Sequence, residues 1–194
     1  MTPEQTDRLR LYVDLLKKWQ KTINLVGKNT LEDAWDRHIL DSAQLSAHIP
    51  QHATLLDIGS GAGFPGLVLA ILRPDISVTL VESDTRKCVF MQTVARETHC
   101  GNVTVLNDRV ESVSPQVAYD VITARALASL ENLLTLSAPF RTKNPALFCL
   151  FLKGKSAEEE LSAAQNRFSF EITKYPSHTN PDACLLHLSR IESC

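Results

Sequence analysis

The sequence predicts an α/β fold, a doubly wound and mostly parallel sheet of seven strands with a helical cap before the first strand. The segment 54–66, TLLDIGSGAGFPG, joins an apolar run to a glycine turn, and a helical apolar pattern follows at 67–72. Strand, tight turn and helix in that order open such a sheet. Further short apolar runs then alternate with helical patterns, which is typical of parallel strands joined by crossover helices.

The cap is expected to consist of two helices, at residues 3–24 and 31–49, because apolar side chains recur there at spacings of three and four. Thr30 followed by Asp33 predicts the start of the second helix. Each helix has one apolar face and needs the rest of the protein to cover it. We therefore expect one domain over 1–194, with a cap at 1–50 and a core at 54–194.

The core elements follow from the same patterns. Strands are expected at residues 55–58, 76–81, 103–107, 119–123, 146–152, 168–174 and 184–191, the last two as an antiparallel hairpin. Helices are expected at residues 84–98, 130–140 and 156–166. Gly101 is expected to close the first of these helices, and Ser156 with Glu159 to form a capping box on the last.

Composition bounds the class of protein. The 194 residues are 44% hydrophobic and 22% charged, which is ordinary for a globular protein. The five cysteines show no C-x-x-C pair, which argues against both a metal site and a disulfide framework. No apolar run is long enough to cross a membrane, and MTPEQTDRLR does not resemble a signal peptide. We expect a cytoplasmic monomer without a metal.

The net charge of −2 argues mildly against strong non-specific RNA binding, which normally rests on a basic surface. A local basic patch can coexist with such a balance.

The glycine turn predicts the ligand class. Residues 61–66 match the dinucleotide pattern G-x-G-x-x-G, but Asp57 stands two residues before Gly59, and Gly61 and Gly63 follow. A pyrophosphate favours free N–H groups and a helix N-terminus rather than a carboxylate. S-adenosylmethionine has no phosphate and carries an ammonium and a sulfonium, so an acid here favours it, directly or through water. A nucleotide cofactor and a site without a ligand are the alternatives.

Acids after the next two strands extend this expected cofactor site. Glu82 ends the second strand, about 20 residues past the glycines, where a carboxylate binds ribose hydroxyls in this fold. That role suits NAD as well. Asp108, Val110 and Glu111 follow the third strand, where an acid can accept from the adenine amino group. Phe64 is expected either beside the cofactor or in the core.

Several segments carry a family resemblance. LLDIGSGAGFPGL, VESDTRKCVFMQ, NDRVE, TARALASL, FLKG and the cap segment Arg-His-Ile-Leu-Asp-Ser resemble the bacterial glucose-inhibited division protein B family over about residues 12–155. The resemblance implies a class I S-adenosylmethionine-dependent methyltransferase, Rossmann-like in fold. It also implies methyl transfer to N7 of one guanine in 16S rRNA, guanine 527 in the family's naming, within naked rRNA or the small ribosomal subunit.

The resemblance also raises a substrate or cofactor role for Arg37 and His38 in the cap. A buried, hydrogen-bonded histidine is the plain alternative for His38, and an ion pair with Arg37 four residues earlier is the plain alternative for Asp41.

Five cations are candidates for substrate contact at the ligand edge: Arg86, Lys87, Arg125, Lys153 and Lys155. Arg125 is expected at the cofactor's edge, where it can hold the methionine carboxylate or, with Lys153, position the guanine. Solvated surface charges and a structural ion pair are the alternatives. No Asn-Pro-Pro-Tyr segment follows the fourth strand, and none is needed, because guanine N7 has a lone pair and no proton to remove.

Two other functions remain open from the sequence. One is a methyltransferase acting on a small molecule or a protein, which the near-neutral charge balance favours. The other is a non-catalytic module that binds NAD through residues 61–66, against which Asp57 speaks.

Overall fold

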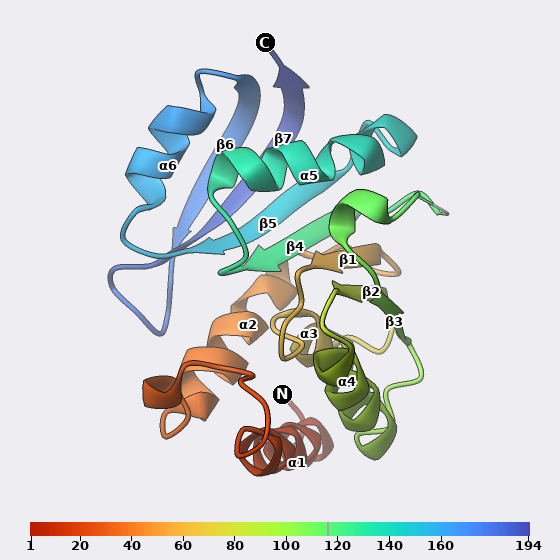
Figure 1. Ribbon diagram of the computed structural model, residues 1–194. Coiled ribbons are helices and arrows are strands. Elements are labelled where there is room, and N and C mark those ends of the chain that lie inside the picture. The colour runs from red at the N-terminus through yellow and green to blue at the C-terminus, as the bar shows by residue number, and fades with distance from the viewer. Residues whose placement is uncertain (116) are drawn as a thin grey trace.

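The computed structural model describes residues 1–115 and 117–194. Seven strands form one sheet in the order β3-β2-β1-β4-β5-β7-β6 (Figure 1). The strands are β1 Thr54–Ile58, β2 Ser77–Glu82, β3 Val103–Asn107, β4 Val121–Arg125, β5 Phe148–Lys153, β6 Phe168–Pro176 and β7 Cys184–Ser193. Strand β7 is antiparallel to both neighbours, and the other pairs are parallel. The predicted fold class is confirmed.

Helices cover both faces of the sheet. They are α1 Pro3–Trp19, α2 Asp41–Ala43, α3 Gly66–Leu72, α4 Thr85–Glu97, α5 Leu130–Lys143 and α6 Ala157–Ala164. Figure 1 shows α5 and α6 on one face and α1 to α4 on the other. Short helical turns lie at η1 Lys28–Thr30, η2 Trp35–Leu40, η3 Gln44–His48 and η4 Val110–Ser112.

Alternating side chains of β1 divide the interior into two apolar cores. Leu55 joins the core under α1, α3 and α4, whereas Leu56 and Ile58 join the core under α5 and α6. Strand β1 lies between β2 and β4, so the strand order runs outward in opposite directions from this pair. Ligands in such folds bind at the carboxyl ends of the strands where the order reverses.

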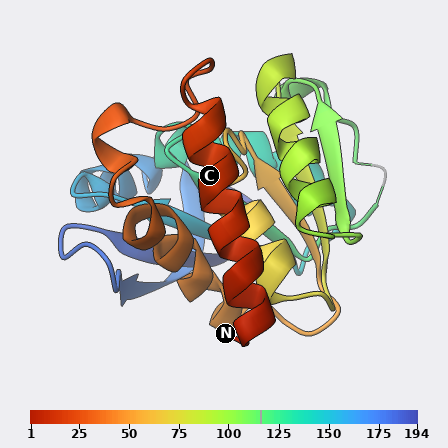
Figure 2. The same ribbon diagram turned by 90° about the horizontal axis from the view of Figure 1, so that it is seen from below.

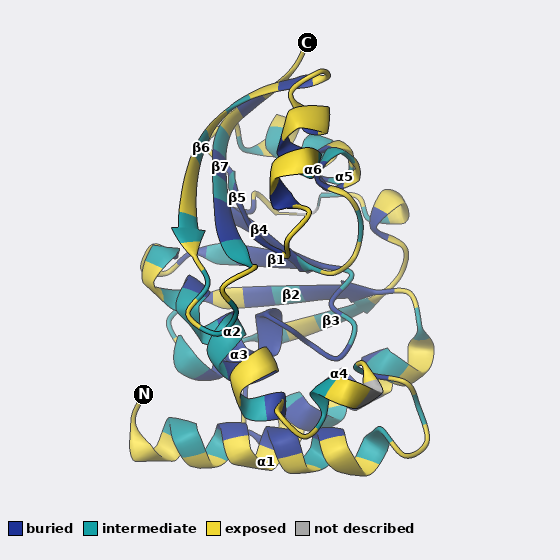
Figure 3. Cartoon of the chain, turned by 90° about the vertical axis from the view of Figure 1, so that its left-hand side faces the viewer, coloured by how far each residue is buried: buried dark blue, intermediate teal, exposed yellow. Residues whose placement is uncertain are grey.

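Helix α1 packs against α3 and α4, and Figure 2 shows it in front of α3 with α4 at its side. Its buried side chains face these helices, and its opposite side is exposed (Figure 3). The helix ends at Trp19, so the predicted end at residue 24 was wrong. The side-chain oxygen of Gln20 accepts hydrogen bonds from the amides of Leu25 and Val26, and these bonds favour a turn over further helix.

The second cap helix is not the continuous α-helix that was predicted. It contains a π-helical turn at Trp35–Leu40, the short α2, and a 3-10 turn at Gln44–His48. Thr30 does not cap it, because the π-helical turn has Ala34 at its N-cap and no side-chain cap bond. The hydroxyl of Ser42 donates to the His38 carbonyl at 2.6 Å and competes with regular backbone pairing. Single π-helical turns often occur at functional sites.

Two predicted helix ends were also wrong. After α4, His99 and not Gly101 adopts the left-handed backbone, with φ of 52°. At α6, the Ser156 hydroxyl donates to the Glu160 carboxylate, so no capping box with Glu159 forms.

No helix in residues 1–115 and 117–194 combines the length and the apolar character needed to cross a membrane.

Candidate active site

The turn between β1 and α3 forms the floor of the site. Gly59, Gly61 and Gly63 have φ of 63°, 58° and 90°, in the left-handed region that favours glycine. A Cβ on Gly63 would lie 2.4 Å from a Leu67 methyl carbon, so close packing also requires glycine there. The Tyr12 hydroxyl of α1 donates to the Ala62 carbonyl and ties the cap to this glycine loop.

Asp57 supports the loop from beneath. Its side chain is fully buried, accepts from the Thr123 hydroxyl at 2.8 Å, and accepts from the Gly66 amide at 3.3 Å. Burial raises the pKa of this carboxyl to about 6. Asp57 does not line the cavity above the loop, so the arrangement leaves it no direct contact with a ligand there.

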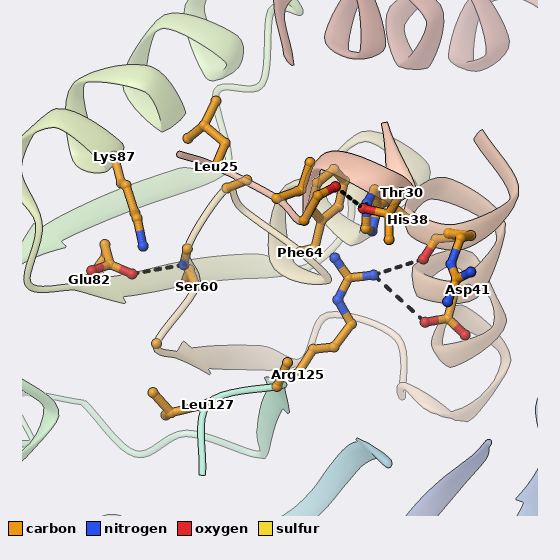
Figure 4. Close-up of a pocket in the computed structure, with 17 residues that line it drawn as sticks. Leu25, Thr30, His38, Asp41, Ser60, Phe64, Glu82, Lys87, Arg125 and Leu127 are labelled. Carbon is orange, nitrogen blue, oxygen red and sulfur yellow. Dashed lines mark hydrogen bonds and ion pairs between the residues drawn. The ribbon is translucent and has the colours of Figure 1, made fainter. Parts of the chain in front are cut away.

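A cavity of about 570 Å³ opens above the glycine loop, a size typical of small-molecule sites (Figure 4). Its walls come from the cap, the loop, the end of β2, the start of α4 and the end of β4. They consist of Leu25, Val26, Gly27, Thr30, Arg37, His38, Asp41, Gly59, Ser60, Gly61, Ala62, Phe64, Glu82, Lys87, Arg125, Ala126 and Leu127.

Glu82 closes one end of this cavity. Its carboxylate accepts from the Gly61 amide and from the Asp84 amide, both at 2.9 Å. The two bonds fix the carboxylate at the end of β2, and Figure 4 shows it beside Lys87. The position agrees with the predicted ribose site, since each carboxylate oxygen can accept more than one hydrogen bond.

Phe64 is the centre of an aromatic stack behind the cavity. Tyr12 and His38 stack on it, each with ring centroids 5.0 Å away, and the Arg125 guanidinium lies 4.8 Å from its ring centroid. The stack joins α1, the glycine loop, the π-helical turn and the end of β4. Phe64 is 3% exposed and packs mainly in the core, although it also belongs to the cavity wall.

Arg125 is held by the cap. Its guanidinium donates to the Arg37 carbonyl at 3.0 Å and lies 3.7 Å from the Asp41 carboxylate. Asp41 also accepts from the hydroxyls of Ser177 and Thr179, which follow β6. The alternative of an Asp41–Arg37 ion pair is therefore not what the structure shows, because the buried guanidinium of Arg125 is the partner of this carboxylate.

His38 is neutral in this setting. Burial, followed by the charges of Arg125 and Arg37, lowers the pKa of its imidazole to about 4. Its Nε2 lies 2.9 Å from the Thr30 hydroxyl oxygen, whereas its Nδ1 has no hydrogen-bond partner among the described residues.

Lys153 does not extend to the predicted phosphate patch. It is 8% exposed, and its ammonium donates to the Ala128 carbonyl and the Glu160 carboxylate, both at 2.7 Å. Glu160 also accepts from the Leu130 amide, so the ion pair positions the segment between β4 and α5. A buried ammonium needs such a partner.

The other predicted cations are dispersed. Lys87 lines the main cavity, but Arg86 is exposed and forms an ion pair with Asp84 at 3.5 Å. Lys155 lines another cavity together with four aspartates. The structure therefore does not bring the predicted cations together as one patch.

Several predicted cofactor residues lie outside the main cavity. Gly63 packs beneath the loop, and the cavity wall does not include Asp108, Val110 or Glu111 beyond β3. Of the predicted cofactor set, the wall includes Gly59, Gly61, Phe64, Glu82 and Arg125.

The segment after Arg125 entered the sequence analysis only as part of the family resemblance, and no role was assigned to Ala126 or Leu127. Ala126 adopts a left-handed φ of 53°, which is uncommon for a residue with a Cβ, and the following Leu127 is 40% exposed. A Cβ on Gly59 would lie 2.4 Å from a Leu127 methyl carbon, so the two residues interlock. Nothing in the sequence pattern distinguishes these two residues from ordinary apolar ones.

A second cavity of about 550 Å³ lies on the far side of this segment. Arg125, Ala126, Leu127 and Asp41 line both cavities. The end of β4 is therefore a shared wall between a cavity above the glycine loop and a cavity beside β5.

Comparison with known proteins identifies the family. The model of the family described as rRNA small subunit methyltransferase G matches residues 5–183. The chain belongs to this family. It is similar to "Ribosomal RNA small subunit methyltransferase G" of Paramagnetospirillum magneticum, with 51% identity over 97% of this chain and 90% of the relative. The protein of the same name in Rhodospirillum centenum is 48% identical over 97% of this chain and 85% of the relative. The predicted family resemblance is confirmed.

Solved structures show the same fold at low identity. A ribosomal protein L11 methylase from Lactobacillus delbrueckii matches with a TM-score of 0.61 and 18% identity, covering 78% of this chain and 76% of that one. A SAM-dependent methyltransferase from Aquifex aeolicus matches with a TM-score of 0.60 and 15% identity, covering 80% and 92%. The core is thus a class I methyltransferase fold, and the family supports S-adenosylmethionine as the cofactor.

Proposed function

We propose that the protein transfers a methyl group from S-adenosylmethionine to N7 of a guanine in 16S rRNA. The observation that carries the proposal is the family match over residues 5–183. The guanine and its N7 come from the resemblance of the sequence to the glucose-inhibited division protein B family. The proposal places the enzyme in the cytoplasm, acting as a monomer.

The cavity above the glycine loop fits S-adenosylmethionine. A Cβ on Gly61 would find its nearest neighbour 3.9 Å away, so this glycine faces open space and lets a ligand approach the backbone. Glu82 offers carboxylate oxygens at one end, which suits a ligand with hydroxyl donors.

Bound S-adenosylmethionine supplies an electrophilic methyl group, and its transfer forms an N7–carbon bond, breaks the sulfur–carbon bond and leaves S-adenosylhomocysteine. N7 uses its lone pair, so the product base is cationic and no proton moves. The protein then needs to hold two ligands in line rather than to provide a general base.

The shared wall of the two cavities agrees with that requirement. Arg125 is held by Asp41 and the Arg37 carbonyl, and its neighbours Ala126 and Leu127 carry no group that could accept a proton. A guanine in the second cavity would approach the cofactor across this wall. The buried pair of Lys153 and Glu160 holds the segment in place, so we propose that Lys153 positions the guanine through the backbone and not by direct contact.

The test supplies methyl-labelled S-adenosylmethionine with 30S subunits from cells that lack this gene, and naked 16S rRNA in parallel. Aniline cleavage at 7-methylguanosine then maps the product. We expect label at one guanine. Labelled rRNA that aniline does not cleave at the labelled base would contradict the N7 assignment, and label only on a protein or small molecule would contradict the rRNA assignment.

A matched pair of variants ties the activity to the cavity. Glu82→Ala removes the carboxylate at the cavity end, and we expect S-adenosylmethionine affinity to fall by about 1.5–3 kcal/mol, as for lost hydrogen bonds to a charged group. Glu159→Ala, which removes an exposed carboxylate of α6 outside the cavity wall, is the control. Equal losses in the two variants would show that the ribose site has been misplaced.

A further inference from the structure

The second cavity has a carboxylate in the part of its wall that the cofactor cavity does not share. Arg125, Ala126 and Leu127 belong to both cavities, whereas Glu160 of α6 lines only the second. Asp41, the other carboxylate in that wall, belongs to both cavities and is engaged by Arg125 and by two hydroxyl groups. Glu160 is therefore the carboxylate that a ligand in the second cavity meets beyond the shared wall.

One oxygen of Glu160 has room for a further hydrogen bond. Its Oε2 accepts from the Leu130 amide and from the Lys153 ammonium, both at 2.7 Å, which occupies both lone pairs of that oxygen. Among the described residues, its Oε1 accepts only from the Ser156 hydroxyl, at 2.8 Å. The side chain is 22% exposed and lines the cavity, so the remaining lone pair of Oε1 is accessible to a ligand.

Glu160 is ionised in this setting. Burial favours the protonated form, but the hydrogen bonds from Lys153 and Ser156 outweigh burial and lower the pKa of the carboxyl below its ordinary value. An ionised carboxylate accepts hydrogen bonds and donates none. A group that binds at Oε1 must therefore supply the hydrogen, as an amino group does.

Guanine carries such a group on the edge opposite to N7. In a duplex, N7 faces the major groove and the 2-amino group faces the minor groove. When N7 faces the shared wall, the 2-amino group points into the part of the second cavity that Glu160 lines. Enzymes that act on a base commonly take it out of the stack and read it by hydrogen bonds inside a pocket. Adenine lacks the 2-amino group, so an acceptor at this place distinguishes the two purines.

We propose that Glu160 determines base specificity by accepting a hydrogen bond at Oε1 from the 2-amino group of the target guanine, while N7 faces the shared wall. The Lys153 ammonium and the Leu130 amide hold Oε2 and thereby orient the carboxylate. The inference deepens the proposed function and rests on it, because it takes a guanine in rRNA as the substrate.

The test replaces the target guanine by inosine, which keeps N7, O6 and N1–H and lacks only the 2-amino group. The 16S rRNA carries either base at the labelled position and is supplied in the form, naked or assembled, that the wild-type enzyme labels better. We expect kcat/KM to be about 10- to 100-fold higher with guanine than with inosine, the range for a hydrogen bond to a charged group. Equal values for the two substrates would overturn the inference without any variant.

Glu160→Gln tests the same contact from the side of the protein. The amide oxygen can replace Oε2 as the acceptor for Lys153 and Leu130, whereas the amide nitrogen takes the place of Oε1 and is a donor. The ratio of kcat/KM for guanine to that for inosine should therefore fall to about one or below. Glu159→Gln, an exposed neighbour on α6 outside the second cavity, is the control and should keep the wild-type ratio.

A purely structural role for Glu160 gives a different result. Glu160→Gln would then lower kcat/KM by the same factor on both substrates and leave their ratio unchanged, which would overturn the inference while the guanine is still labelled. Urea unfolding and titration with S-adenosylhomocysteine report whether the variant keeps its fold and its cofactor cavity, and the wild-type comparison decides the question if it does not. The proposed function fails separately, when the wild-type enzyme labels neither RNA or labels it at a base that aniline does not cleave, and the inference then falls with it.

Discussion

Replacing Tyr12 by Phe tests whether the cap holds the glycine loop in shape. The change deletes only the hydroxyl, which donates to the Ala62 carbonyl, and keeps the ring that stacks on Phe64. Tyr12 is fully buried and Ala62 is 3% exposed, so no solvent replaces the lost donor. An unsatisfied buried carbonyl costs about 1–3 kcal/mol of unfolding free energy. For a chain of this length the unfolding midpoint should fall by roughly 2–10 °C.

The assay combines urea unfolding with calorimetric titration of S-adenosylhomocysteine. We expect lower stability together with a few-fold weaker affinity, because the ligand must then order the loop as well as bind to it. Tyr175→Phe is the control, since the Tyr175 hydroxyl is only partly buried and forms no hydrogen bond within the described residues. If Tyr12→Phe changed stability and affinity no more than Tyr175→Phe, the cap would not be positioning the loop.

Three further changes probe other parts of the structure. Gly66→Ala would place a Cβ 2.3 Å from a leucine methyl carbon and should destabilise the fold by about 1–3 kcal/mol in urea unfolding, whereas Gly101→Ala meets no atom within 4 Å and should stay within about 0.5 kcal/mol. Lys153→Ala leaves the Glu160 carboxylate without its partner and should cost about 3 kcal/mol or more, measured as a lower urea midpoint; a neutral result would contradict the ion pair. The pKa of His38 is about 4 in the folded protein and 6.5 in the unfolded chain, so the unfolded chain binds more protons between these two pH values. The free energy of unfolding should therefore rise with pH in this range, by up to about 1.4 kcal/mol per pH unit. Urea unfolding at several pH values should show this contribution in the native protein and not in His38→Leu.

Local sequence patterns were sufficient for the sheet and its glycine turn. The run 54–58 alternates between two cores, and the following glycines need backbone angles that few other residues adopt, so both signals are contained in a few neighbouring residues. The position of Glu82 at the tip of β2 followed from the same logic.

The cap was predicted less well, because its geometry depends on distant partners. The π-helical turn aligns His38 with Phe64 and leaves Asp41 facing Arg125, contacts that join residues far apart in sequence. Lys153 looked like a free cation for the same reason, since Glu160 becomes its partner only when α6 folds back on β5. Helical periodicity contains no information about such pairs.

The aromatic stack on Phe64 has a consequence for how this enzyme can be divided or recombined. Its members, Tyr12, His38, Phe64 and Arg125, come from four segments that span most of the chain, and each contributes one layer. A cap grafted from a relative would bring two layers of the stack without the other two. Chimeras of family members should therefore fold with an intact glycine loop only when the exchanged cap and the accepting core supply side chains that stack together at all four positions.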